Sequence, residues 1–130
     1  MIVHFPVGLL TSGVVFEIYG ALQKDEVVAT AGRFNIRFGL SCLLPVFGVG
    51  FLGMLSLENT EKIREFLSSH LQFAFISTVV FISAVLVSRY FKKTWGKILY
   101  LLIIAMGGVC ILTTGYFGGE LVHRFGVSTH

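Results

Sequence analysis

The residues of this sequence with the clearest capacity for chemistry are its four histidines, because imidazole ligates metals and haem iron and titrates near neutral pH. Three of them, His4, His70 and His123, stand at or just beyond the ends of long apolar stretches, and the fourth is His130. If these stretches are helices rising about 1.5 Å per residue, the first three histidines lie within roughly two turns of one another in depth. Ligand-type side chains at the edge of a membrane are candidates for function.

One interpretation is that His4 and His70 ligate a single haem b as the axial ligands of its iron. Bis-histidine ligation requires two imidazoles at similar depth on opposite sides of the ring, with small residues beside it. Gly8 and Ala74 each lie about one helical turn deeper than one of these histidines and would leave that clearance. On parallel helices that sit diagonally in a bundle, the two imidazoles would face each other across the core.

Other residues near the same end extend this hypothesis, and two alternatives remain open. Arg124 or Arg64 would pair with the haem propionates, and His123, which follows two glycines, would hydrogen-bond a propionate. Alternatively, His4, His70 and His123 together bind zinc or copper at the outer face. In the third interpretation they are interfacial side chains that hydrogen-bond to loops.

Motifs for other kinds of chemistry are not found in the sequence. There is no nucleophile–base pattern, phosphate-binding glycine loop or metalloprotease spacing, so we expect no enzyme. No basic stripe with interleaved aromatics indicates a nucleic-acid partner. Cys42 and Cys110 fall at different expected depths and are interpreted as unpaired small hydrophobic residues. Without a Cys-x-x-Cys-His motif, no covalently attached haem is expected.

The elements that must position the histidines follow from the hydropathy of the 130-residue chain. Hydrophobic residues make up 55% of it and charged residues 13%, a balance typical of membrane proteins. Four apolar stretches each approach the roughly 20 residues that cross about 30 Å of hydrocarbon; their expected bounds are 5–22, 38–57, 67–87 and 98–117. Because short connections make neighbours antiparallel, we predict one all-α domain over 1–130, an integral membrane four-helix up-down bundle in the lipid bilayer.

Lysines and arginines set the expected orientation of this bundle. Seven of them lie in or beside the first and third connections, and three lie at the opposite end. By the positive-inside rule the end with seven is cytoplasmic. Both termini are then expected on the extracytoplasmic side of a bacterial inner (plasma) membrane. The seven are Lys24, Arg33, Arg37, Arg89, Lys92, Lys93 and Lys97, and the three are Lys62, Arg64 and Arg124.

Glu17 is the only acidic residue inside a predicted span, and we favour a structural ion pair with Arg37 or Arg89 over a proton relay.

Glycines in the second and fourth spans predict close approach between helices, and would also clear space for a flat cofactor. These glycines are Gly48, Gly50, Gly53, Gly107, Gly108, Gly115, Gly118 and Gly119.

Several of these residues resemble a known family of small membrane proteins. The segments Val3–Pro6 and Gly8–Leu10, the acid Glu17, His70 at the start of the third span and the ending Gly118–Val127 resemble the domain-of-unknown-function family 2231. The resemblance covers nearly the whole chain and is most specific at its two ends. In that family aspartate is usual at the position of Glu17, and tyrosine is common at the position of His123.

The resemblance implies a small four-helix membrane protein, and some relatives are joined to c-type cytochrome domains. By association, this favours work near electron transfer. The leading hypothesis is therefore a haem-b-binding subunit of a respiratory or photosynthetic electron-transfer complex. The alternatives are a cofactor-free accessory subunit that packs against larger membrane partners and a metal-binding membrane protein.

Overall fold

The computed structural model describes residues 4–55, 61–90 and 93–125, without the side chains at 53–55, 61–62 and 124–125. These residues form four helices and no strand. The helices are α1 (His4–Gln23), α2 (Glu26–Leu55), α3 (Glu61–Tyr90) and α4 (Thr94–Phe125). By length and composition, all four can cross a membrane. The predicted all-α class with four spans is therefore confirmed.

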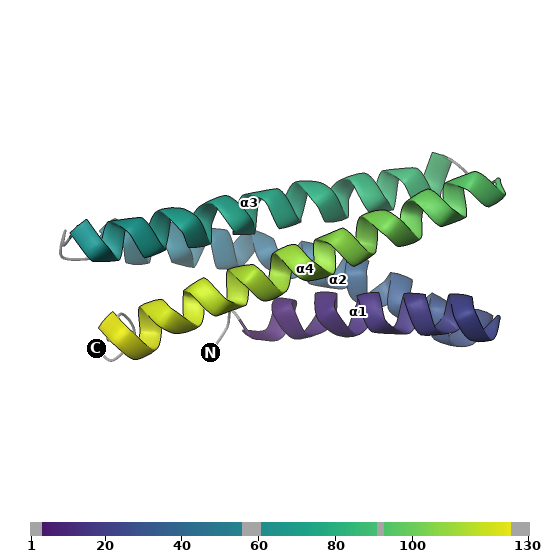
Figure 1. Ribbon diagram of the computed structural model, residues 1–130, viewed down its shortest axis with the longest axis horizontal. Coiled ribbons are helices and arrows are strands. Elements are labelled where there is room, and N and C mark those ends of the chain that lie inside the picture. The colour runs from purple at the N-terminus through teal and green to yellow at the C-terminus, as the bar shows by residue number, and fades with distance from the viewer. Residues whose placement is uncertain (1–3, 56–60, 91–92, 126–130) are drawn as a thin grey trace.

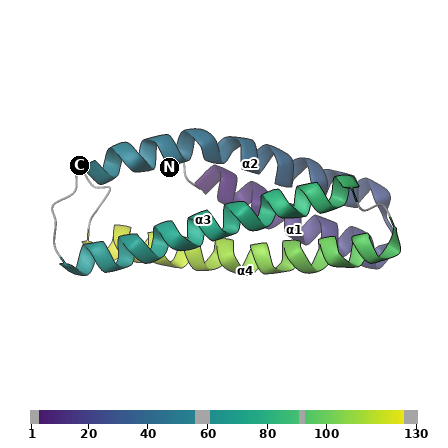
Figure 2. The same ribbon diagram turned by 90° about the horizontal axis from the view of Figure 1, so that it is seen from above.

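The four helices form two hairpins that lie against each other (Figures 1 and 2). Consecutive helices run in opposite directions, so α1 begins and α4 ends toward the same end of the bundle, here called the terminal end. Both hairpins turn at the other end, here called the hairpin end. α1 packs along α2 and α3 along α4, whereas the hairpins meet mainly through α1 and α4. α1 and α3 make no helix–helix contact along their described residues.

The helices extend well beyond the apolar stretches that the sequence defines. The segment 23–37, expected as a polar connection, is mostly the beginning of α2. Lys24 ends α1 in the left-handed region with φ of 56°, and the amide of Asp25 donates to the carbonyl of Gly20 at 2.9 Å, which closes the last turn. The Asp25 carboxylate then accepts from the amides of Val27 and Val28 and caps α2. The hairpin needs only two residues to turn.

Glycines bring α1 and α2 into backbone contact. A Cβ atom on Gly20 would lie 2.5 Å from the amide nitrogen of Ala29, and one on Gly32 would lie 2.7 Å from that of Glu17. A Cβ on Gly13 would lie 3.0 Å from the amide nitrogen of Ile36. Close approach of this kind gives helices in a membrane their packing energy. It also fixes the position of Glu17 against α2.

An apolar core joins the two hairpins near the middle of the bundle. Leu10 of α1, Ile36 of α2, Phe81 of α3 and Ile104 of α4 are almost fully buried within it. Phe81 packs flat against Gly107, whose missing side chain leaves room for the ring. The core therefore links all four helices, since each contributes a buried side chain to it.

Candidate functional site at the terminal end

His70 is held in one orientation by α4. Its Nδ1 lies 2.9 Å from the backbone carbonyl oxygen of Thr114. Because a carbonyl oxygen only accepts, Nδ1 carries the hydrogen in this bond, and Nε2 of the neutral ring keeps its lone pair. A Cβ atom on Gly118 would lie 3.1 Å from the imidazole, so the ring packs on bare backbone there. Histidines that ligate metals are commonly oriented by such an Nδ1–H bond to a carbonyl.

Counting residues along the helices relates the depth of His4 to that of His70. α1 and α4 run antiparallel and touch where a Cβ on Gly108 would lie 3.4 Å from Val14. His4 on α1 and Gly118 on α4 each lie ten residues from this contact, toward the terminal end. Since both helices rise equally per residue, these two positions are equally far along their helices from the contact. Gly118 in turn contacts His70, so α4 relates the two histidines in depth.

The other predicted ligands are less enclosed. His4 and His123 are exposed, and no three of the histidine, cysteine and acidic side chains that the structure describes gather as a possible metal-binding group. The side chain of Arg124 lies outside the described residues, as does His130. Arg64 is exposed on α3.

Open space adjoins the level of the histidines. Gly8 of α1 and Gly115 and Gly119 of α4 have no atom within 4 Å of the position that a Cβ would take. The glycines of the fourth span therefore divide into two sets. Gly107, Gly108 and Gly118 permit contact with a neighbouring helix, as predicted, whereas Gly115 and Gly119 leave backbone uncovered.

Aromatic rings surround His70 on the surface shared by α3 and α4. The Phe117 ring stacks on Phe73, with centroids 5.7 Å apart, and meets Phe66 edge-on at 6.1 Å. Phe66 and Phe73 stand one turn before and one turn after His70 on α3, so the imidazole lies between them on this helix face. His70 is thus flanked by aromatic residues on α3 and bonded to the Thr114 carbonyl of α4.

A second polar cluster occupies the hairpin end. Glu17 is 3% exposed and its Oε1 lies 3.5 Å from Nη1 of Arg33. Arg33 also pairs with Glu26 at 3.3 Å, and Lys97 of α4 lies 3.8 Å from the same carboxylate. The predicted ion pair of Glu17 exists, but its partner is Arg33 and not Arg37 or Arg89. The sequence pattern missed Arg33 because it placed this residue in a loop.

The fold and these sites define a class: a multi-pass membrane protein of four helices, with His70 nearer one end and the Glu17–Arg33 ion pair nearer the other. The family model described as "Predicted membrane protein (DUF2231)" matches residues 1–130. The chain therefore belongs to this family, which confirms the resemblance seen in its sequence. No curated protein and no solved structure matches the chain.

Sequence reasoning did not find two features of the structure. One is the Thr114 carbonyl, since a backbone acceptor leaves no mark in side-chain spacing. The other is the set of α1–α2 glycines, Gly13, Gly20, Gly32 and Gly39. Their spacing offered a signal, because Gly13 and Gly20 are seven residues apart and so are Gly32 and Gly39, which places each pair on one helix face.

Proposed function

We propose that this protein is a membrane-integral subunit of an electron-transfer complex that binds one haem b through His4 and His70. The supporting observation is the fixed imidazole of His70, and residue counting from the α1–α4 contact makes a similar depth for His4 reasonable. A haem-ligating histidine needs a free Nε2 and a defined ring orientation, and the bond from Nδ1 to Thr114 supplies both.

The surroundings of the two histidines suit a flat ring. The backbones of α1 and α3 are not adjacent, so the helices that carry the proposed ligands sit diagonally in the bundle. Gly8, Gly115 and Gly119 present uncovered backbone near the same level. A bound haem would supply one-electron transfer, while the chain would orient it and exclude water through the aromatic rings beside His70.

The reduced-minus-oxidised visible spectrum of the purified protein tests this function. We expect a low-spin haem b spectrum for the wild type. His4→Ala and His70→Ala should each lose the haem or make it high-spin, because one imidazole alone leaves iron five-coordinate. His123→Ala is the matched control and should keep the low-spin spectrum. No haem b band in a fully assembled sample, or loss of the band only in His123→Ala, would contradict the assignment.

An accessory subunit without cofactor is the second candidate, and the exposed half of α2 favours it. A Cβ on Gly39 would lie 3.0 Å from Leu10. His4 on α1 and Pro45 on α2 each lie six residues from this contact, toward the terminal end. Beyond Pro45, α2 continues with no part of α1 beside it, and it exposes Phe47, Val49, Phe51 and Leu52. A helix of a larger partner would cover these side chains.

Cross-linking in native membranes tests the accessory role. A photoreactive amino acid at Val49 or Phe51 should cross-link to a specific protein partner. At Val79, an exposed α3 position in the middle of the bundle, it should label lipid. Equal lipid labelling at all three positions would contradict a partner on α2.

A further inference from the structure

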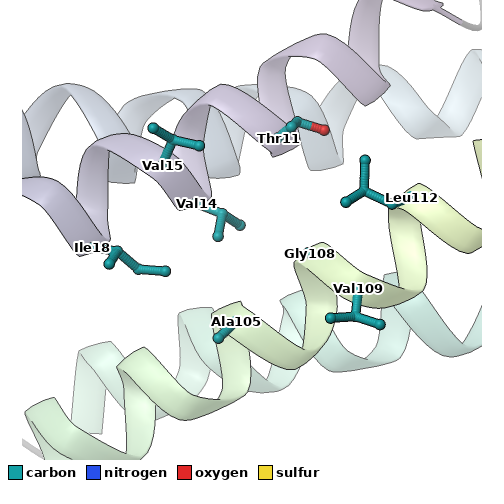
Figure 3. Close-up of a pocket in the computed structure, with 8 residues that line it drawn as sticks. All are labelled: Thr11, Val14, Val15, Ile18, Ala105, Gly108, Val109 and Leu112. Atoms are coloured by element: carbon teal, nitrogen blue, oxygen red, sulfur yellow. The ribbon is translucent and has the colours of Figure 1, made fainter.

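Two surfaces of the bundle contrast in polarity. The shallow groove between α1 and α4 (Figure 3) presents no polar surface, so the hydrocarbon of a bilayer covers it without leaving a polar group unsatisfied. One face of α2, by contrast, carries polar side chains from the hairpin end to the middle of the helix. They follow one another at steps of four, three, four and four residues, which keeps them on one side of the helix. These residues, here called the polar stripe, are Glu26, Thr30, Arg33, Arg37 and Ser41.

The polar stripe extends beside α1, a helix long and apolar enough to cross a membrane. Asn35 donates to the Ser12 hydroxyl at 3.1 Å, and a Cβ on Gly13 would lie 3.0 Å from the amide nitrogen of Ile36. These contacts place Arg37 beside the middle of α1, roughly 16 Å from the hairpin end of that helix. Because side chains on a helix lean toward its N-terminus, Arg37 extends toward the hairpin end, where α2 begins.

The charges around the polar stripe leave one cation over. Arg33 pairs with Glu17 at 3.5 Å and with Glu26 at 3.3 Å. Lys97 lies 3.8 Å from the Glu26 carboxylate, so two carboxylates balance two cations. Arg37 is exposed, and its guanidinium makes neither an ion pair nor a hydrogen bond in the part of the chain that the structure describes. An arginine at this depth is costly without a counter-charge, so an anion from outside the chain should meet it.

The chemistry along this face of α2 follows the order of a phospholipid. The planar fork of a guanidinium donates two parallel hydrogen bonds to a phosphate. Three and seven residues beyond Ser41, the same face turns apolar at Leu44 and Gly48. Leu44 is 76% exposed, and Gly48 has nothing within 4 Å of its Cβ position. A cation directed toward the hairpin end is therefore followed by open apolar surface, which acyl chains cover and a free phosphate ion does not use.

We propose that Arg37 binds the phosphate of an anionic phospholipid from the leaflet at the hairpin end, with the acyl chains of the lipid along Leu44 and Gly48. The single negative charge of this lipid balances the cation that the chain leaves unpaired. The site lies on α2, which carries neither of the proposed haem ligands, so this binding requires neither haem nor electron transfer.

Native mass spectrometry of the purified protein in detergent measures this binding. Dioleoylphosphatidylglycerol should bind at its first site more tightly than dioleoylphosphatidylcholine, and an excess of inorganic phosphate should not displace it. Arg37→Gln should weaken phosphatidylglycerol binding about tenfold, the effect of one charge-assisted hydrogen bond, and should remove the preference. Arg89→Gln is the matched control: it removes the same charge from an exposed arginine of α3 and should leave the binding unchanged.

Cross-linking in native membranes distinguishes a lipid from a protein at this site. A photoreactive amino acid at Ser41, an exposed position one turn from Arg37, should label anionic phospholipid beyond its share of the membrane. The same group at Val79, exposed on α3, should label lipids in proportion to their abundance.

Three results would each overturn the proposal. One is that the wild type binds the two lipids equally, or that inorganic phosphate displaces phosphatidylglycerol. Another is that Arg37→Gln binds phosphatidylglycerol as tightly as Arg89→Gln does. The third is a cross-link from Ser41 to a protein instead of a lipid, which would assign the charge to a carboxylate of a partner's helix.

Discussion

The carboxylate of Glu17 on α1 lies 3.5 Å from the guanidinium of Arg33 on α2, and the carboxylate is almost fully buried. Removing the arginine leaves that charge unpaired away from water. Arg33→Ala should therefore lower the free energy of unfolding by about 3 kcal/mol. Glu17→Gln should cost less, because the arginine is partly exposed and still pairs with Glu26 at 3.3 Å.

Unfolding of the detergent-solubilised protein by SDS titration measures both changes. Glu26→Gln is the control: its side chain is 73% exposed, so the free energy of unfolding should change by about 0.5 kcal/mol or less. An effect of Arg33→Ala no larger than that of Glu26→Gln would show that the buried carboxylate does not need its partner.

This ion pair also shows what the sequence could and could not predict. A lone acid in an apolar stretch predicts a cationic partner from the same end of the bundle, and the partner exists. Which arginine it is depends on the path of residues 24–37. They look like a loop because they are polar, yet Asp25 starts a helix that aligns Arg33 with Glu17. Helix capping and helix–helix contact decide that path, and the hydropathy of the sequence reveals neither of them.

The close contact of α1 and α2 predicts strong sensitivity at two glycines. Gly20→Ala places a methyl group 2.5 Å from the Ala29 nitrogen, and Gly32→Ala places one 2.7 Å from that of Glu17. Backbone atoms cannot move aside without separating the helices. Each substitution should lower the free energy of unfolding by about 2 kcal/mol.

Two glycines of α2 provide the matched control for this packing. Gly48 and Gly50 have nothing within 4 Å of the Cβ position. Alanine at either should be neutral or stabilise by up to about 1 kcal/mol, because it favours helix more than glycine does. If all four variants unfold alike in SDS, the backbone contact of α1 with α2 is not what holds this hairpin.

The turn between α1 and α2 predicts one stabilising change and one destabilising change. Lys24 adopts φ of 56°, a conformation that costs a side-chain-bearing residue about 1 kcal/mol. Lys24→Gly should raise the free energy of unfolding by roughly that amount. Asp25→Ala removes the acceptor for the Val27 and Val28 amides and should lower it by about 1 kcal/mol. Asp25→Asn keeps an acceptor and serves as the control; a loss equal to that of Asp25→Ala would argue against capping.

The histidines show a different limit of sequence reasoning. Counting along apolar stretches predicts a similar depth for His4 and His70, and in the structure α4 contacts α1 at Val14 and His70 at Gly118. Counting cannot reveal that the Nδ1 of His70 bonds to Thr114, because that bond depends on the rotation of α3 against α4. Nor can it distinguish Gly118, which contacts His70, from Gly119, which is uncovered.

The orientation of the bundle in the membrane is a prediction that labelling can decide. Lys24 directly follows α1 and Lys93 directly precedes α4, so both lie at the hairpin end, whereas Arg64 lies in the first turn of α3, near the terminal end. Figure 1 shows these helix ends. All three side chains are exposed. In a background with Cys42 and Cys110 replaced by alanine, each position is changed to cysteine in turn. Because the hairpin end carries the excess of lysine and arginine, it should face the cytoplasm.

A membrane-impermeant maleimide added to intact cells should then label Arg64→Cys and leave Lys24→Cys and Lys93→Cys unmodified. After permeabilisation all three should react to the same extent, which shows that each thiol is accessible. The proposed haem ligands His4 and His70, near the terminal end, would then lie at the outer face. Labelling of Lys93→Cys in intact cells would reverse the orientation and place the histidines on the cytoplasmic side.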